Sequence, residues 1–272
     1  MRILVTGASG QLGYDVEREL ERRGIEHLGT SSRELDITDR AAVEHLMQSY
    51  RPDAVIHCAA YTKVDLAEDE PERCWAVNAD GTRNLAAACR EIGAKLLYIS
   101  TDYVFPGTGE QFRRTDDPVS PVNTYGRSKL AGELAVQSLL EKYFIVRISW
   151  VFGKNGNNFV KTMRRLGKER ASLNVVFDQA GTPTYARDLA QAIVDILPQI
   201  KPGTKEVYHF SNEGVCSWYD FATAIMAQSD LDCEVLPIES KDYPTPAVRP
   251  SYSVLNKAKI KKDFGIKINH WA

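Results

Sequence analysis

Short apolar runs alternate with amphipathic stretches over the first half of the chain. Continuous apolar and β-branched residues predict five strands, at Arg2–Thr6, Glu26–Thr30, Ala54–Cys58, Lys95–Ser100 and Phe144–Ser149. Helical patterns lie between them, including Gln11–Arg23, with an apolar face of Leu12, Val16 and Leu20, and a longer region over Pro71–Ile92. This alternation predicts right-handed β–α–β units, and therefore an α/β fold with a Rossmann-like, doubly wound parallel sheet.

The pattern changes after Trp150. Short mixed elements rich in Gly, Asn and Pro follow, with helices expected at Phe159–Leu166, Ala186–Leu197 and Ser217–Gln228. No fixed-period repeat or long linker separates the two parts. We expect residues 1–150 to form the Rossmann domain and residues 151–272 to form mainly a smaller C-terminal lobe, with some segments returning to the first domain. A cleft between the parts is the expected ligand site.

Charge and composition narrow the class of partner. The 272 residues carry a net charge of −2, which gives no broad attraction to nucleic acid or to an anionic membrane. There is no export signal and no apolar stretch near the ~18 residues of a membrane helix, so we expect a cytoplasmic protein without membrane or nucleic-acid partners. The five cysteines lack metal-type spacing; we expect them to be reduced and structural, and predict no metal site.

A glycine-rich loop follows the first predicted strand. Gly7, Gly10 and Gly13 recur every three residues where the first helix begins, so the backbone can turn tightly and approach a pyrophosphate. Helix N–H groups then face the anion. We therefore predict a dinucleotide site formed by the loop residues Gly7, Gly10, Gln11, Leu12 and Gly13.

The second predicted strand ends without the carboxylate that usually binds the adenosine ribose. It runs into Ser31, Ser32 and Arg33, and no acidic residue comes before Glu34. Hydroxyls and a guanidinium suit a 2′-phosphate, so the sequence favours NADP(H) over NAD(H), with NAD(H) as the alternative. Residues 1–150 are thus predicted to bind NADP(H).

Three candidate catalytic residues follow the fourth predicted strand. Tyr125 stands four residues before Lys129, so on a helix the two share a face and the ammonium can lie beside the phenol. A neighbouring cation favours the phenolate and brings the group closer to proton transfer at neutral pH. Thr101 can donate a hydrogen bond to the same substrate oxygen.

These motifs resemble those of the extended short-chain dehydrogenase/reductases, and within them the dTDP-4-dehydrorhamnose reductases. The resemblance spans nearly the whole chain. It rests on the stretches Gly7–Gly13, Cys58–Asp65, Ser100–Phe105, Tyr125–Lys129, Ser149–Gly153, Gly156–Lys161, Gly181–Thr184 and Val248–Ser253. Ser-Thr-Asp-Tyr-Val-Phe and Arg-Pro-Ser are the more specific parts, since the loop and the Tyr/Lys pair mark only the superfamily.

The resemblance implies a role for each matched residue. Tyr125 would be the acid, Lys129 would hold the nicotinamide ribose, and Thr101 would orient the carbonyl. The cofactor would also meet Ser32, Arg33, Asp36, Ile37, Ala59, Ala60, Tyr61, Thr62 and Ser100. The sugar nucleotide would meet Thr101, Asp102, Trp150, Asn158 and Arg249, with Arg249 facing the diphosphate.

The implied activity is reduction of the 4-keto group of dTDP-4-dehydro-6-deoxy-L-mannose by NADP(H) to give dTDP-L-rhamnose, in nucleotide-sugar and carbohydrate biosynthesis. Three alternatives stay open: a sugar-nucleotide epimerase, a reductase of another 4-keto sugar, and a non-catalytic NADP-binding regulatory subunit. No local motif decides between monomer and homodimer, or whether magnesium is required. Members of this family look as though they continue into a closing helix after the position of Ala272, which leaves the packing of the C-terminal lobe open.

Overall fold

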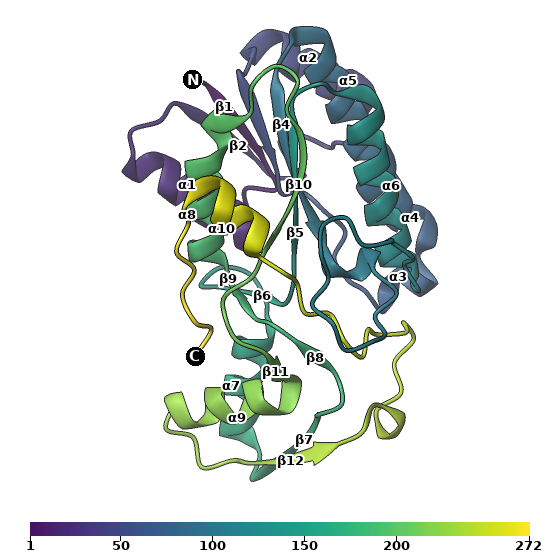
Figure 1. The fold of residues 1–272 in the computed structure, drawn as a ribbon, viewed down its shortest axis with the longest axis vertical. Helices are drawn as coiled ribbons and strands as arrows, with labels where there is room; N and C mark the ends of the chain where they lie inside the picture. Colours follow the sequence, from purple (N-terminus) through teal and green to yellow (C-terminus); the bar gives the residue numbers. More distant parts are fainter.

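The computed structural model describes residues 1–272. Six parallel strands form the central sheet in the order β10-β5-β4-β3-β1-β2 (Figure 1). They are β1 (Ile3–Thr6), β2 (His27–Thr30), β3 (Ala54–His57), β4 (Lys95–Thr101), β5 (Tyr143–Ile148) and β10 (Lys205–Phe210). The predicted doubly wound parallel sheet is confirmed. The strand order reverses at β1, where open α/β sheets bind their ligands.

Helices cover both faces of the sheet (Figure 1). One face packs on α1 (Gln11–Arg22), α8 (Ala186–Ile196) and α10 (Ala258–Phe264) through a core of 23 buried residues. The other packs on α2 (Arg40–Tyr50), α5 (Thr82–Ile92) and α6 (Thr124–Leu139) through a core of 17. All strands except the edge strands are therefore apolar on both sides, which explains their continuous hydrophobic runs.

The helical region predicted over Pro71–Ile92 is not one α-helix. It consists of α4 (Pro71–Trp75), a π-helical segment η1 (Ala76–Gly81) and α5, preceded by the single turn α3 (Leu66–Asp69). The wider turn accommodates Asn78, which is 1% exposed and bonds the backbone of Tyr61 through both ends of its amide. The apolar pattern does not reveal such a bulge, and π-bulges occur frequently at functional sites.

A smaller lobe lies at the far end of the sheet, below it in Figure 1. Its core has nine buried residues and is built from α7 (Phe159–Glu169), α9 (Trp218–Gln228) and a parallel pair, β7 (Ser172–Val176) with β12 (Glu234–Ile238). Two further strand pairs join the parts: β6 (Val151–Phe152) with β9 (Thr184–Tyr185), and β8 (Ala180–Gly181) with β11 (Cys216–Ser217). Single turns η2 (Asp102–Val104), η3 (Leu197–Gln199) and η4 (Ser240–Asp242) complete the chain.

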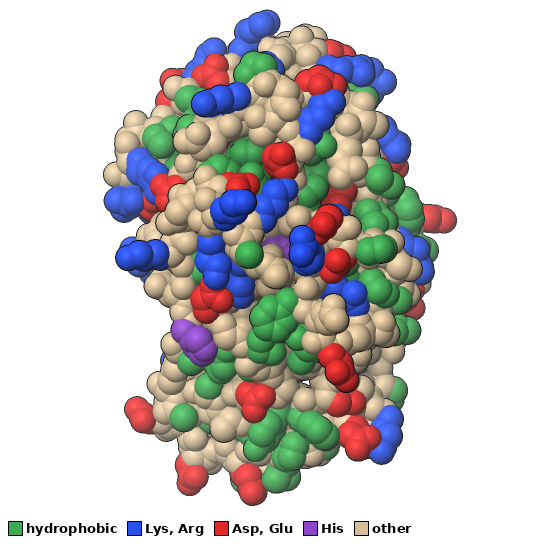
Figure 2. All heavy atoms as spheres, in the orientation of Figure 1, with side chains coloured by type: hydrophobic (Ala, Val, Ile, Leu, Met, Phe, Trp, Pro, Cys, Tyr) green, Lys and Arg blue, Asp and Glu red, His purple; other side chains and the backbone are tan.

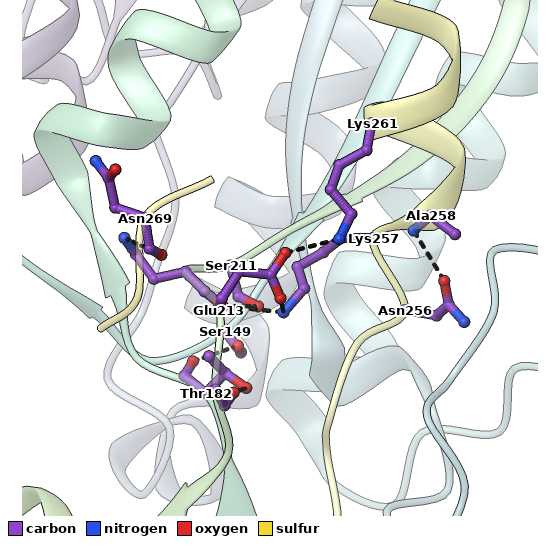
Figure 3. A network of polar contacts seen from close by, with 11 residues as sticks. Ser149, Thr182, Ser211, Glu213, Asn256, Lys257, Ala258, Lys261 and Asn269 are labelled. Carbon is purple, nitrogen blue, oxygen red and sulfur yellow. Dashed lines mark hydrogen bonds and ion pairs between the residues drawn. The ribbon is translucent and has the colours of Figure 1, made fainter. Parts of the chain in front are cut away.

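Polar contacts fix the C-terminal segment to the loop after β10 (Figure 3). Lys257, 6% exposed, donates to the Asn212 carbonyl at 2.9 Å, and Glu213 lies between Lys257 (3.3 Å) and Lys261 (2.8 Å). Burial lowers the pKa of Lys257, and the adjacent Glu213 carboxylate acts against that shift. These contacts hold α10 on β10 and so determine where the preceding segment, 247–255, runs.

The surface agrees with a small net charge. Basic and acidic side chains are interspersed on the upper part of the face in Figure 2, and acidic ones are more frequent on the lower lobe. None of the helices has the length and apolar character needed to cross a membrane. A surface hollow of about 560 Å³ lies between α8 and residues 263–269, but it contains none of the predicted catalytic residues.

Candidate active site

The glycine loop joins β1 to α1 at the point where the strand order reverses. Gly7 has φ +70°, and a Cβ there would lie 2.6 Å from the backbone nitrogen of Ala59, so only glycine fits between the ends of β1 and β3. Gly10 caps α1 without any side-chain hydrogen bond, and a Cβ on Gly13 would collide with the Gly7 carbonyl. The loop is therefore a backbone cradle with helix amides at its rim, which suits a pyrophosphate.

A second loop lies over the first. Asn155 donates to the carbonyls of Ser9 and Gly10 at 2.8 and 3.0 Å, and Asn158 donates to the Gln11 side chain at 3.1 Å. Asn158 also caps α7. The prediction included Asn158 and Gln11 but missed Asn155, for which a glycine- and asparagine-rich loop gives no distinguishing signal.

The loop after β2 presents the residues predicted to select the cofactor. Ser32 and Arg33 are exposed. Glu34 instead accepts from the Ser31 amide at 2.8 Å, which turns the carboxylate back onto its own loop. An exposed guanidinium next to a serine hydroxyl is the arrangement expected for a 2′-phosphate.

Other residues that were expected to meet the cofactor lie on the following loops. Asp36 is exposed and accepts from Thr38, while Ile37 is buried against Gly81. After β3, Ala59 and Ala60 are half-buried, Tyr61 is buried and Thr62 is exposed. Asn78 fixes this segment and reaches α6 by donating to Ser128 at 3.0 Å. Sequence reasoning missed Asn78, since a lone asparagine in a helical region is usually exposed.

The catalytic residues lie where α6 crosses the end of β4. Asn123 caps α6 by accepting from the Gly126 amide at 2.8 Å, and Glu68 accepts from both the amide and the hydroxyl of Thr124. This fixes the first turn of α6, which contains Tyr125. Thr101, the last residue of β4, donates to Asp102 at 3.0 Å.

Burial shifts the pKa values of Tyr125 and Lys129. It raises the pKa of Tyr125 well above the ordinary value for a phenol, and a hydrogen bond with Thr101 acts against that rise. Lys129 is 3% exposed, donates to the Ile99 carbonyl at 2.7 Å and lies 4.1 Å from the centre of the Tyr98 ring. Its pKa falls to about 7 through burial, with Glu133 the main opposing influence. The expectation that Lys129 lowers the phenol pKa is not seen here, because the ammonium is turned toward the Ile99 carbonyl.

The C-terminal segment pairs with β8 beside the predicted substrate residue Trp150. Ala180 pairs with Ser251 and Ser253 through backbone bonds of 2.9 Å, and Gly181 packs against Trp150. Trp150 has φ +46° and stacks on Trp218 with ring centres 3.6 Å apart. Trp150 therefore belongs to the aromatic core of the smaller lobe as well as to the predicted site.

Asp102 and Arg249 carry the charge in this region. Asp102 is 2% exposed, one of its oxygens has no partner, and burial raises its pKa to about 6. Arg249 bonds Asp65 at 2.6 Å and the Tyr103 hydroxyl at 3.2 Å. Asp65 and Tyr103 lie in the stretches that carried the family resemblance, but the predicted site did not include them. The role of Arg249 toward a diphosphate stays a prediction.

Comparisons with known proteins place the chain in a family. The family model described as "RmlD substrate binding domain" matches residues 1–272. The chain is 42% identical to the spore coat polysaccharide biosynthesis protein SpsK of Bacillus subtilis, covering 99% of this chain and 94% of that protein. It is also 42% identical to a dTDP-4-dehydrorhamnose reductase of Aggregatibacter actinomycetemcomitans, covering 99% and 95%.

A solved structure gives the same result. The crystal structure of a dTDP-4-dehydrorhamnose reductase from Bacillus anthracis in complex with NADP superposes with a TM-score of 0.95 at 44% identity, covering 99% of this chain and 95% of the other. The family expected from the motifs is thus confirmed by sequence and by fold. This chain belongs to the dTDP-4-dehydrorhamnose reductase family.

Proposed function

We propose that this chain is an NADP(H)-dependent oxidoreductase that reduces the 4-keto group of dTDP-4-dehydro-6-deoxy-L-mannose to give dTDP-L-rhamnose, with Tyr125 as the proton donor. The observation that carries the proposal is the hydrogen bond between Thr101, at the carboxyl end of β4, and the Tyr125 phenol, with Lys129 one turn further along α6 and the Gly7 cradle at the end of β1 in the same sheet. Family membership and the NADP complex of the relative support the reaction and the cofactor. We assign residues 1–150 mainly to the cofactor and the smaller lobe to the substrate.

The chain provides binding, orientation and proton delivery. A bound NADPH supplies the hydride. The amides of the glycine loop and Arg33 would hold its phosphates, and Lys129 would hold the nicotinamide ribose. The Tyr125 phenol is protonated at neutral pH, since burial raises its pKa further above the ordinary value for a phenol, and it can donate a proton to the alkoxide that forms at the sugar C4. Thr101 would orient the carbonyl, and Asp102, Trp150, Asn158 and Arg249 would hold the sugar nucleotide.

The proposal extends to the setting of the reaction. A nucleotide-sugar substrate and a nicotinamide cofactor are consistent with cytoplasmic biosynthesis without a nucleic-acid or membrane partner. The proposed reaction is compatible with a monomer and with a homodimer. The structure holds no group of three or more His, Cys, Asp or Glu side chains that could bind a metal.

The test compares wild type with Tyr125→Phe, using NADPH and NADH separately and an enzymatically generated dTDP-4-keto-6-deoxy-L-sugar. We expect NADPH to be the better cofactor and the variant to lose roughly 10²–10⁴-fold in kcat while still binding NADPH, since it lacks only the proton donor. The measurement is the decrease of reduced-nicotinamide absorbance with time. No turnover by a wild type that binds NADPH would favour another 4-keto sugar or the regulatory subunit, and tightly retained cofactor without net oxidation would favour an epimerase.

A further inference from the structure

A buried ion pair lies directly behind the catalytic residues. Glu133 of α6 receives two bonds from Arg147 of β5, at 2.9 and 2.7 Å, and one from the Ser100 hydroxyl of β4 at 2.5 Å. The three residues are 0%, 4% and 2% exposed, respectively. The guanidinium also lies 5.0 Å from the centre of the Phe105 ring. One carboxylate therefore connects a helix to two strands in the interior of the sheet.

Stability alone does not explain this arrangement. Two charges taken out of water recover their desolvation cost only with near-ideal geometry, and well-packed apolar residues are often as stable or more so. The position of the pair within the site suggests a different role. Ser100 directly precedes Thr101, and Glu133 is one helical turn beyond Lys129. The contact thus joins the strand that carries Thr101 to the helix that carries Tyr125 and Lys129.

The helix α6 packs tightly against β4 and η1 at Gly132. A Cβ on Gly132 would lie 2.6 Å from the Asn78 carbonyl oxygen and would also collide with the Tyr98 hydroxyl. The helix therefore approaches β4 and η1 as closely as a backbone can. A contact that fixes α6 at Glu133 fixes the register of the whole first half of the helix.

Electrostatics points to the same carboxylate. The titratable groups around Lys129 come from β3 and its end, α4, β4 and α6, and they are His57, Cys58, Cys74, Tyr98, Tyr125 and Glu133. Burial lowers the pKa of His57 to about 3 and raises that of Cys58 to about 12, and it also raises the pKa values of Cys74 and both tyrosines. These groups are therefore neutral at neutral pH. The Glu133–Arg147 ion pair lies behind them, and the Coulombic influence of Glu133 favours the ammonium form of Lys129.

We propose that Glu133 is a positioning residue for the reductase reaction, which holds α6 in register on β4 and places a carboxylate one helical turn from Lys129. The inference rests on the proposed function for its catalytic consequence. Its effect on Lys129 can be measured without turnover, because Lys129 would hold the nicotinamide ribose. It acts through Lys129 and Thr101 and touches neither substrate nor cofactor.

The main experiment measures kcat/KM for the keto sugar and the NADPH dissociation constant, from NADPH fluorescence, across pH 5 to about 9. In Glu133→Gln the charge is lost while a hydrogen-bonding side chain of equal length remains. Activity that needs the ammonium falls as pH rises through the Lys129 pKa, so we expect this alkaline limb to move down by about 1 pH unit, with the same shift in NADPH affinity. Glu133→Asp keeps the charge but shortens the reach; we expect its limb to stay in place while kcat falls about tenfold or more.

Two further variants serve as a control and as a replacement if Glu133→Gln does not fold. Glu19→Gln is the matched control, because Glu19 is a buried glutamate on α1 that accepts from Arg22 and Arg23 outside the site. We expect it to leave the pH profile unchanged. Glu133→Gln combined with Arg147→Met removes both charges, so that no cation is left buried without a partner if Glu133→Gln alone does not fold.

Each outcome has one meaning. A shifted limb in Glu133→Gln, or a smaller shift in the same direction in the double variant, where loss of the Arg147 cation acts in the opposite sense, supports the proposal if the limb is unshifted in Glu133→Asp and Glu19→Gln. Folded variants whose limbs match wild type would overturn it, as would failure of both Gln variants to fold, since the pair would then serve the fold alone. If wild type does not turn over the sugar but the shift in NADPH affinity appears, the proposed function fails and the role of Glu133 toward Lys129 stands.

Discussion

At the scale of single residues, burial decides which groups of the site are charged. Tyr125 is held in its neutral form, Lys129 has a pKa of about 7, and Asp102 has a pKa of about 6. The proton donor is thus available across the neutral range. The pH dependence of the site is therefore expected to come from Lys129 and Asp102 rather than from the phenol.

Asp102→Asn should stabilise the protein at neutral pH. Because burial places the folded-state pKa of Asp102 above the unfolded value, its contribution to stability is fully present below about pH 4 and is lost as pH rises through about 6. We expect the variant to gain about 2–3 kcal/mol in the free energy of unfolding at pH 7 and close to nothing at pH 4. Urea unfolding at the two pH values measures both numbers.

The control for this measurement is Asp80→Asn, which changes an exposed carboxylate paired only with Arg83 on the same helical surface. It should stay within about 0.5 kcal/mol of wild type at both pH values. An equal gain in unfolding free energy for Asp102→Asn at pH 4 and pH 7 would contradict this prediction, because Asp102 would then have the same charge at both pH values.

At the scale of elements, α6 organises the site. Its buried face includes Gly126, Ser128, Lys129, Gly132 and Glu133, so small and polar residues stand where an apolar stripe would normally be. A hydrophobic pattern therefore predicts the helix only weakly, and the Tyr125/Lys129 spacing identifies it. The sequence predicted which face reacts, but not how closely the helix packs, because that depends on contacts with β4 and η1.

Gly132→Ala tests this close approach. The added methyl group would contact the Asn78 carbonyl and the Tyr98 hydroxyl, so α6 must shift away from β4. We expect a loss of about 1–3 kcal/mol in unfolding free energy and a larger proportional loss in kcat than in NADPH affinity.

Leu134→Ala is the matched control for Gly132→Ala. Leu134 is 56% exposed on the same helix, and its truncation should change stability by less than about 0.5 kcal/mol. Wild-type activity in Gly132→Ala would mean that the placement of α6 on β4 is not critical for the reaction.

At the scale of the whole molecule, local sequence patterns predict the strands of the central sheet well and those of the smaller lobe poorly. The bounds of the first five strands were predicted within one residue, because buried parallel strands give continuous apolar runs. β10 was not among the predicted strands, and the pair β7 with β12 joins segments far apart in the chain. Such pairings depend on tertiary contacts. The same holds for Asp65, Asn78, Asn155 and Glu133, whose partners all lie in other elements.

The most direct test of the account follows the hydride itself. Wild-type protein is incubated with the keto sugar and NADPH that carries deuterium at the transferable position of nicotinamide C4, and the sugar product is examined by NMR. The account predicts dTDP-L-rhamnose with deuterium bonded to C4 of the sugar, formed in equal amount to the NADPH consumed. A product without deuterium at C4, or an isomerised sugar formed without net NADPH oxidation, would contradict it.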